Sequence, residues 1–196
     1  MLLGLTGPAG VGKDTVAQFL AGYGFVSYAF AKPLKEALSV LDINEPDTRE
    51  AKEQLIPNRP YSYRTAAQRL GTEFARAIDP DFWLKLAASR TCGNYNTVVT
   101  DVRFENEATW VRKQGGLLVH IIGRRTTVNG INAKHSSENG VHLLSSDVIL
   151  DNSGDKIHLL NNVKQLVLKD IPLFVEKQHA SSCRSEFNSV DVPTGR

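Results

Sequence analysis

A glycine-rich turn near the amino terminus limits what this chain can fold into more than any other feature. Gly7, Gly12 and Lys13 follow the pattern G-x-x-x-x-G-K. An apolar run at 2–6 precedes the turn, and apolar residues at helical spacing follow it. A strand before this turn and a helix after it indicate a turn whose backbone N–H groups bind phosphate, with Lys13 adding a positive charge. The alternative is a tight strand-to-helix turn with an incidental lysine.

Asp14 stands where the common form of this motif has a serine or threonine that ligates magnesium. A carboxylate there can bind the ion or a water of its shell, because magnesium prefers oxygen ligands. It can also satisfy free N–H groups in the first turn of the helix, and both roles stay open. Thr15 keeps a hydroxyl one position later, where it suits an α-phosphate oxygen.

Predicted strands alternate with predicted helices along most of the chain. Strands are expected at 2–6, 24–30, 97–101, 116–123 and 146–152, and further helices at 33–41, 64–78, 80–90, 105–114 and 155–169. This alternation predicts an α/β fold in which helices cover both faces of a mostly parallel sheet. With 196 residues in all, we expect one domain at 1–171 and a weakly docked or mobile tail at 172–196.

Two internal segments lack periodicity. Residues 42–63 are polar and contain prolines, so a surface segment is expected. Residues 124–145 form a long loop, and long loops in compact domains are usually functional or disordered.

Composition excludes several classes of protein. A net charge of +2 gives no general attraction to nucleic acid, and no apolar run is long enough for a membrane span. The two cysteines lie far apart, so neither a zinc site nor a disulfide framework is suggested. The start of the chain lacks the features of a secretion signal, and we expect a cytoplasmic protein.

A second polar cluster follows the strand expected at 97–101. Asp101 falls at the carboxyl end of that strand, the edge where open α/β sheets bind ligands, and Arg103 and Glu107 follow it. Asp101 can orient magnesium or take a proton, and Arg103 can hold a phosphate with two hydrogen bonds. The alternative for Arg103 and Glu107, four residues apart, is a surface ion pair on a helix.

A third cluster lies in the helix expected at 64–78. Its polar members share one face by helical spacing, namely Arg64, Gln68, Gly71 and Thr72. Ala67, Leu70, Phe74 and Ala77 cover another face. The polar face can receive a flat ligand or simply meet solvent. Trp83 can stack on a base or belong to the core.

Two arginines open the long loop, and a turn follows the last strand. Arg124 and Arg125 suit a lid that stabilises the charge of a transferring phosphate, or are ordinary solvated charges. Asn152 begins a turn at 152–154 whose backbone can face an adenine, although any strand-to-helix turn has this composition.

Six motifs in this order resemble the phage-type deoxynucleoside monophosphate kinases, a branch of the P-loop nucleotide kinases. They are GPAGVGKDT, FAKPLK, QRLGTE, DPDFW, VVTDVRFENEA and HSSE. The resemblance implies a three-layer α/β fold with about five mostly parallel strands and a lid loop at about 124–145. In this pattern GKD followed by threonine is normal, so Asp14 belongs to the motif. Thr65 departs from it, because some relatives have a basic residue there.

The resemblance also implies roles for individual residues. ATP and its magnesium would be held by Gly7, Gly10, Gly12, Lys13, Asp14, Thr15 and Asn152, with Asp14 and Asp101 near the metal. The acceptor deoxynucleoside monophosphate would be held by Arg64, Gln68, Gly71, Thr72, Trp83, Asp101, Arg103 and Glu107. Catalysis would come from Lys13, Asp101, Arg103, Arg124 and Arg125, chiefly through positioning and charge neutralisation.

The sequence therefore yields the hypothesis of a kinase that transfers the γ-phosphate of ATP to a deoxynucleoside monophosphate, in the host cytoplasm if a phage encodes it. The alternatives are a P-loop kinase for a coenzyme precursor or a sugar, and a nucleotide-binding switch. An NKxD signature, expected of a GTP switch, is absent from the sequence. The oligomeric state stays open between a monomer and a homodimer.

Overall fold

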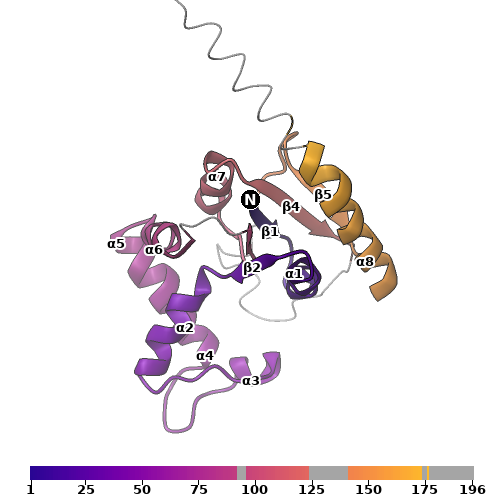
Figure 1. The fold of residues 1–196 in the computed structure, drawn as a ribbon. Coiled ribbons are helices and arrows are strands. Elements are labelled where there is room, and N and C mark those ends of the chain that lie inside the picture. Colours follow the sequence, from indigo (N-terminus) through magenta and orange to yellow (C-terminus); the bar gives the residue numbers. More distant parts are fainter. Residues whose placement is uncertain (92–95, 124–140, 174–175, 177–196) are drawn as a thin grey trace, which may run out of the picture.

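Five parallel strands form one sheet in the described part of the chain, in the order β2-β3-β1-β4-β5 (Figure 1). The computed structural model describes residues 1–91, 96–123, 141–173 and 176. The strands are β1 (Leu2–Thr6), β2 (Phe25–Tyr28), β3 (Asn96–Val99), β4 (Leu117–Ile122) and β5 (Val148–Asp151). Each neighbouring pair is parallel, so the connections cross over the sheet, and the predicted α/β fold is confirmed.

Helices occupy the connections between these strands. The α-helices are α1 (Lys13–Ala21), α2 (Ala31–Val40), α3 (Arg49–Glu53), α4 (Tyr63–Gln68), α5 (Arg76–Ile78), α6 (Phe82–Thr91), α7 (Glu105–Lys113) and α8 (Lys156–Gln165). Two π-helical segments, η1 (Arg69–Ala75) and η4 (Leu166–Asp170), continue α4 and α8. The helices expected at 64–78, 80–90, 105–114 and 155–169 are thus confirmed to within a few residues, with α3 added inside the mostly exposed segment 42–63.

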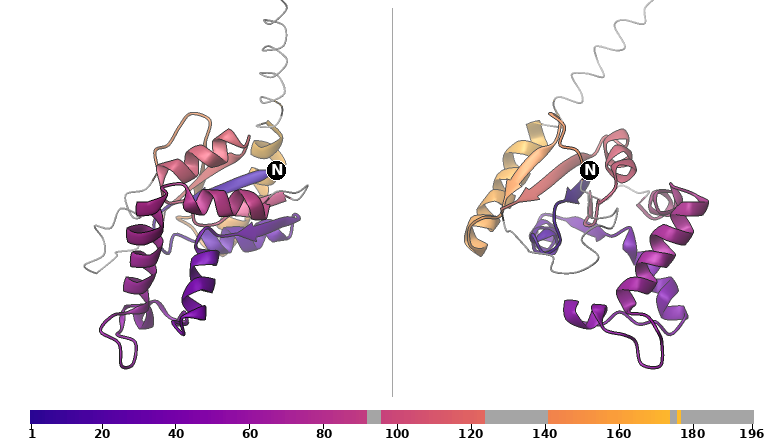
Figure 2. Two further views of the ribbon diagram at one scale, coloured as in Figure 1. Left: turned by 90° about the vertical axis from the view of Figure 1, so that its left-hand side faces the viewer. Right: turned by 180° about the vertical axis from the view of Figure 1, so that it is seen from behind.

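Side chains alternate between the two faces of the sheet, and each face has its own core. Leu3, Leu5 and Val119 are buried on the face covered by α1 and α8. Val99 and Leu118 are buried on the other face, against α6 and α7. The two views of Figure 2 show the sheet between these helices, which gives the three layers that the sequence predicted.

A separate group of helices extends from the β2 side of the sheet. Figure 1 shows α2, α3 and α4 lying together there, away from β5. A third apolar cluster holds this group together, with Leu38, Ile43 and Tyr63 buried at its centre. The space between this group and the carboxyl ends of β1 and β3 is where an open α/β sheet binds ligands.

None of the helices in the described residues is long and apolar enough to cross a membrane.

Candidate active site

The turn between β1 and α1 has a backbone that requires its glycines. Gly7, Gly10 and Gly12 have φ values of 141°, 74° and 102°, in the region that favours glycine. A Cβ atom on Gly7 would lie 2.5 Å from the carbonyl oxygen of Ile121, and one on Gly12 would lie 2.6 Å from Nδ2 of Asn152. The turn is therefore shaped by close contact with β4 and with the residues after β5.

Lys13 begins α1 and reaches back over this turn. Its Nζ atom donates hydrogen bonds to the carbonyl oxygens of Gly7 at 2.8 Å and Pro8 at 2.9 Å. This places an ammonium group across the mouth of the turn. Asp14 follows in the first helical turn with an exposed side chain, and Thr15 is half-buried.

Asn152 stabilises the turn through its side chain. Its side chain is buried, and Nδ2 donates to the carbonyl oxygen of Val11 at 2.7 Å. Its backbone N–H donates to Ile122 at 2.7 Å, which fixes the chain where β5 ends. The backbone of Asn152 was predicted as a contact for adenine, and in the structure the side chain of this residue holds the glycine turn.

A cavity of about 480 Å³ opens in front of the turn. This volume falls in the usual range of small-molecule sites. It brings together the predicted residues of both sides, namely Gly10, Lys13, Asp14, Arg64, Gln68, Gly71, Thr72, Trp83, Asp101, Arg103 and Glu107. Gly7, Gly12, Thr15 and Asn152 are not among the residues that line this cavity. Arg124, Arg125 and the rest of the expected lid up to residue 140 lie outside the described residues, as does most of the expected tail.

One wall of the cavity is formed by α4 and η1. Ser62 caps the start of α4, where its hydroxyl accepts the N–H of Thr65 at 3.2 Å. The side chains of Arg64, Gln68 and Thr72 line the cavity from this wall. Phe74 was expected on an apolar face of a regular helix, but it is 61% exposed, and the π-helical turns are the physical reason for the difference.

Trp83 supports this wall and also lines the cavity. Its indole N–H donates to the carbonyl oxygen of Gly71 at 2.9 Å, inside the π-helical segment. Gly71 is itself buried, and a Cβ there would lie 3.0 Å from Leu34 of α2. Trp83 is 7% exposed, so it belongs largely to the core while its surface forms part of the cavity.

Asp101 joins the end of β3 to the start of α2. Its two carboxylate oxygens accept the backbone N–H groups of Phe30 at 2.8 Å and Ala31 at 2.9 Å. Burial raises the pKa of Asp101, and these two hydrogen bonds act in the opposite direction. In this geometry the carboxylate positions α2 at the edge of the cavity.

Glu107 is the most buried charged group of the cavity, with 2% of its side chain exposed. One carboxylate oxygen accepts the backbone N–H groups of Arg103 and Phe104, at 2.7 and 3.0 Å. The other oxygen forms an ion pair with Arg76. Burial raises the pKa of Glu107 to about 7, against the influence of these hydrogen bonds and of the Arg76 charge. The surface ion pair with Arg103 that spacing allowed is replaced by this pair with Arg76.

Further charges surround the outer part of the cavity. Arg64 forms an ion pair with Glu53 of α3. Lys35 and Lys52 both contact Glu45, at 2.9 and 2.6 Å, and all three line the cavity. The wall facing Lys13 therefore carries several cations, which favours an anionic ligand.

The described residues contain no group of three or more His, Cys, Asp or Glu side chains placed to hold a metal ion. Magnesium is usually bound by one or two carboxylates together with substrate phosphates, so such a group is not required for it. Asp14, exposed beside Lys13 in the cavity, has the chemistry that this mode of binding needs.

A family model described as deoxynucleotide monophosphate kinase matches residues 40–163. The chain belongs to this family. The match includes Arg64, Gln68, Thr72 and Arg103 of the cavity, whereas the glycine turn at 7–15 lies before it. As a member of the deoxynucleotide monophosphate kinase family, the chain is an ATP-dependent phosphotransferase.

Individual proteins give further comparisons for this kinase. A protein of Acanthamoeba polyphaga mimivirus, provisionally named deoxynucleotide monophosphate kinase, is 31% identical over 147 residues, which are 62% of this chain and 73% of that protein. A solved gluconokinase from Sinorhizobium meliloti 1021 has a TM-score of 0.44 and 14% identity, covering 84% of this chain and 91% of its own. A sugar kinase from Janibacter sp. HTCC2649 has a TM-score of 0.44 and 16% identity, covering 87% and 94%.

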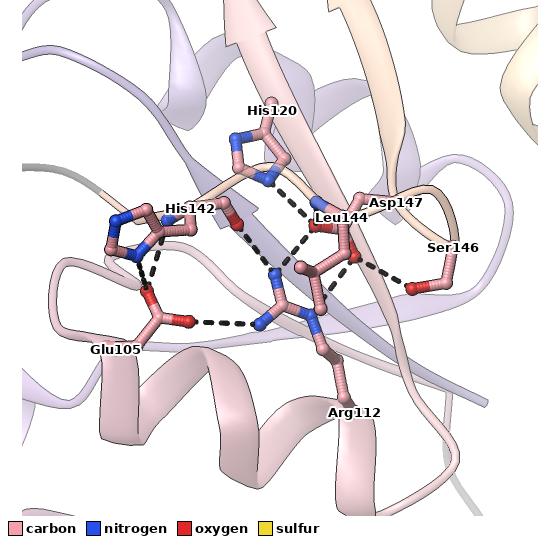
Figure 3. Close-up of polar contacts among 7 residues, drawn as sticks. All are labelled: Glu105, Arg112, His120, His142, Leu144, Ser146 and Asp147. Atoms are coloured by element: carbon pink, nitrogen blue, oxygen red, sulfur yellow. Dashed lines mark hydrogen bonds and ion pairs between the residues drawn. The ribbon is translucent and has the colours of Figure 1, made fainter.

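A polar network anchors the kinase chain where it returns to β5 (Figure 3). Asp147, with 1% of its side chain exposed, accepts hydrogen bonds from Arg112 of α7 at 2.7 and 3.1 Å and contacts His120 of β4 at 3.1 Å. Arg112 also contacts Glu105 and the carbonyl oxygen of His142. The network fixes residues 142–147 against the sheet and α7.

Two cavity residues of this kinase were missed by the sequence analysis. Arg76 lies four residues after Thr72, and this spacing was the signal that could have extended the polar face to it. Lys35 lies in the FAKPLK motif, which was used for the resemblance without a role being given to its lysine.

Proposed function

We propose that this kinase transfers the γ-phosphate of ATP to a deoxynucleoside monophosphate, giving ADP and a deoxynucleoside diphosphate. The observation that carries the proposal is the shared cavity, in which Lys13 of the glycine turn and Arg64 and Arg103 of the opposite wall line one space. Two anionic substrates must be brought together for this reaction, and a cavity with cations on both sides offsets their mutual repulsion.

On the donor side, the glycine turn has the properties of a phosphate cradle. Positive φ values at Gly7, Gly10 and Gly12 let backbone N–H groups converge, and the start of α1 adds its positive dipole end. Lys13 is placed to give up its contacts with carbonyl oxygens for β- and γ-phosphate oxygens. Thr15 is assigned to the α-phosphate.

Magnesium fits the donor side through Asp14, with Asp101 at the other edge of the cavity. When bound, the ion neutralises charge on the β- and γ-phosphates. Asp101 has both oxygens engaged by backbone N–H groups, so its contribution is to hold α2 in place. Asp14 has an exposed carboxylate beside Lys13 and is the better candidate to contact the ion or its water shell.

On the acceptor side, the wall offers both charge and neutral polar groups. Arg103 has an exposed side chain, and its guanidinium can hold the acceptor phosphate with two hydrogen bonds. Gln68 and Thr72 supply donors and acceptors for the nucleoside, and Trp83 supplies a flat apolar surface. Arg64 adds a second cation next to them.

The reaction requires little covalent chemistry from the protein. An oxygen of the acceptor phosphate attacks the γ-phosphorus, and the bond from that phosphorus to the β–γ bridging oxygen breaks, leaving ADP. The acceptor is already an anion, so no strong base is required. Lys13 and Arg103 act by alignment and by stabilising the charge of the loose transition state.

A panel of acceptors tests this function. The purified kinase is supplied with ATP labelled in the γ-phosphate and with each of the four bases as deoxynucleoside and as ribonucleoside monophosphate. We expect label in the diphosphate of at least one deoxynucleotide, and its loss in Lys13→Ala but not in Lys164→Ala, an exposed lysine of α8. Label that appears only in inorganic phosphate, or only in ribonucleoside diphosphates, would refute the proposal.

A further inference from the structure

Arg76 lies on the same continuous helix as Arg64 and Thr72, and this helix is not a regular α-helix. At 3.6 residues per turn, a residue twelve positions after Arg64 would lie about 120° around the helix axis from it. The π-helical segment between them has wider turns, with i→i+5 hydrogen bonds, and such segments are frequent at functional sites. Arg76 lines the same cavity as Arg64 and Thr72.

Among the described residues the guanidinium of Arg76 has three partners, and two of them, Glu107 and Phe104, belong to the turn and helix that follow Arg103. It forms the ion pair with Glu107, it lies over the ring of Phe104 at 3.9 Å from the centroid, and it donates to the carbonyl oxygen of Pro80 at 3.3 Å. Only 12% of the Arg76 side chain is exposed. Its donors are thus directed to the protein, and it is placed to act through other residues.

Glu107 connects Arg76 to the backbone of Arg103. One of its oxygens faces Arg76, and the other accepts the N–H groups of Arg103 and Phe104. A single carboxylate thereby fixes two consecutive peptide units of the turn that follows β3. The cation on its other side stabilises the carboxylate in its ionised form, in which it is the stronger acceptor.

We propose that Arg76 is a positioning residue for the acceptor phosphate. Through Glu107 and Phe104 it holds the turn at Arg103 in the conformation that presents the Arg103 guanidinium to the cavity. This inference rests on the proposed function, and it gives a role to a residue that itself need not touch the substrate.

Removal of Arg76 has a physical consequence for this turn. Glu107 would remain buried without its counter-charge, an arrangement that is strongly unfavourable for an ionised carboxylate. Its pKa, already raised to about 7 by burial, would rise further without Arg76, so that the group would take up a proton near neutral pH. The hydrogen bonds from Arg103 and Phe104 would then weaken.

A double-mutant cycle tests the inference in the full chain. Arg76→Ala should raise the KM for the accepted deoxynucleoside monophosphate by about tenfold, in keeping with coupling between residues in contact, and leave the KM for ATP unchanged. In an Arg103→Ala background the same substitution should change the acceptor KM by less than about threefold. Arg76→Lys, which keeps the charge, should restore part of the loss. Equal effects of Arg76→Ala in both backgrounds would overturn the inference.

The matched control is Arg69→Ala, in the same π-helical segment, where the side chain is 72% exposed and faces Glu73. It should leave both KM values unchanged. A second readout needs no substrate: amide hydrogen exchange at Arg103 and Phe104 should be about tenfold faster in Arg76→Ala and unchanged in the control. Unchanged exchange at these two amides refutes the inference even if the parent kinase is active.

The two measurements separate the inference from the proposed function. A parent chain that transfers no phosphate to any of the deoxynucleoside monophosphates refutes the proposed function, and with it a role for Arg76 toward the acceptor. Activity in the parent together with unchanged exchange refutes only the positioning role. If Arg76→Ala fails to fold, Arg76→Lys replaces it, with a smaller rise in acceptor KM and a smaller increase in exchange expected, and no change in either refutes the positioning role.

Discussion

The substitution Gly12→Ala is expected to destabilise this kinase more than an ordinary change in a loop. Gly12 has φ of 102°, and a side chain at such an angle costs about 1–3 kcal/mol in backbone strain. The added Cβ would also lie 2.6 Å from Nδ2 of Asn152, closer than real contacts allow. Asn152 is 3% exposed, so it has little freedom to move away.

The second contribution comes from the hydrogen bond that Asn152 would lose. The hydrogen bond from Nδ2 of Asn152 to the carbonyl oxygen of Val11, at 2.7 Å, is buried. Leaving a buried polar group without a partner costs about 1–3 kcal/mol. Strain and lost hydrogen bond together give about 2–6 kcal/mol. Gly24→Ala isolates the first contribution, because φ there is 83° and nothing lies within 4 Å of the added Cβ.

Urea unfolding of the two variants measures the difference. We expect Gly12→Ala to lose about 1–3 kcal/mol more free energy of unfolding than Gly24→Ala, at unchanged m-value. In an Asn152→Ala background the contact is gone, and Gly12→Ala should cost no more than Gly24→Ala. Equal losses for the two glycine variants in the parent background would refute the reasoning, since the contact with Asn152 would then carry no energy.

Three further outcomes are expected. Lys13→Ala should lower kcat by about 10²- to 10³-fold, as for the loss of one key donor, while Lys164→Ala leaves steady-state rates unchanged. Trp83→Phe keeps an aromatic side chain but removes the indole N–H that donates to Gly71, and should cost about 1–3 kcal/mol of unfolding free energy, read by thermal denaturation. Burial acts to raise the pKa of Asp147, but its hydrogen bonds hold the pKa below the usual 3.8. The ionised carboxylate therefore stabilises the folded state, and the parent should lose this contribution to the free energy of unfolding only as the pH falls through that region. Asp147→Asn should abolish that acid-dependent part, and an unaltered dependence of stability on pH from 2 to 5 would contradict it.

Local patterns were sufficient to predict the order of strands and helices along the chain and the glycine-rich turn between β1 and α1. The strands are short apolar runs with ends marked by glycine or polar residues, and the helices show regular spacing, as in the stretch that became α7. The turn at 7–15 combines glycines and a lysine whose positions are fixed relative to one another. Signals of this kind lie within a few residues, so the sequence alone displays them.

Contacts between distant segments could not be predicted in the same way. The pair of Arg76 and Glu107 joins residues 31 positions apart, and Asn152 reaches the glycine turn across 141 positions. The sequence placed Asp101 correctly at the end of a strand, but its hydrogen bonds to Phe30 and Ala31 depend on how β2 lies beside β3.

The π-helical segment was the main reason why the cavity wall formed by α4 and η1 could not be predicted fully. A template with 3.6 residues per turn puts Phe74 on the apolar side, whereas the structure leaves it exposed. The hydrogen bond from Trp83 to Gly71 reaches this segment from α6, and no periodicity in the chain indicates such a contact.

The same segment lets this helix hold one residue more without turning its far end away from the cavity. With one residue deleted between 69 and 75 and regular α-helical pairing restored, Arg76 would stand eleven positions after Arg64, about 20° from it around the axis. It would therefore stay on the face that carries Arg64. Alignments of related chains that place a gap in this stretch would thus join sequences whose residues on both sides of the gap still correspond.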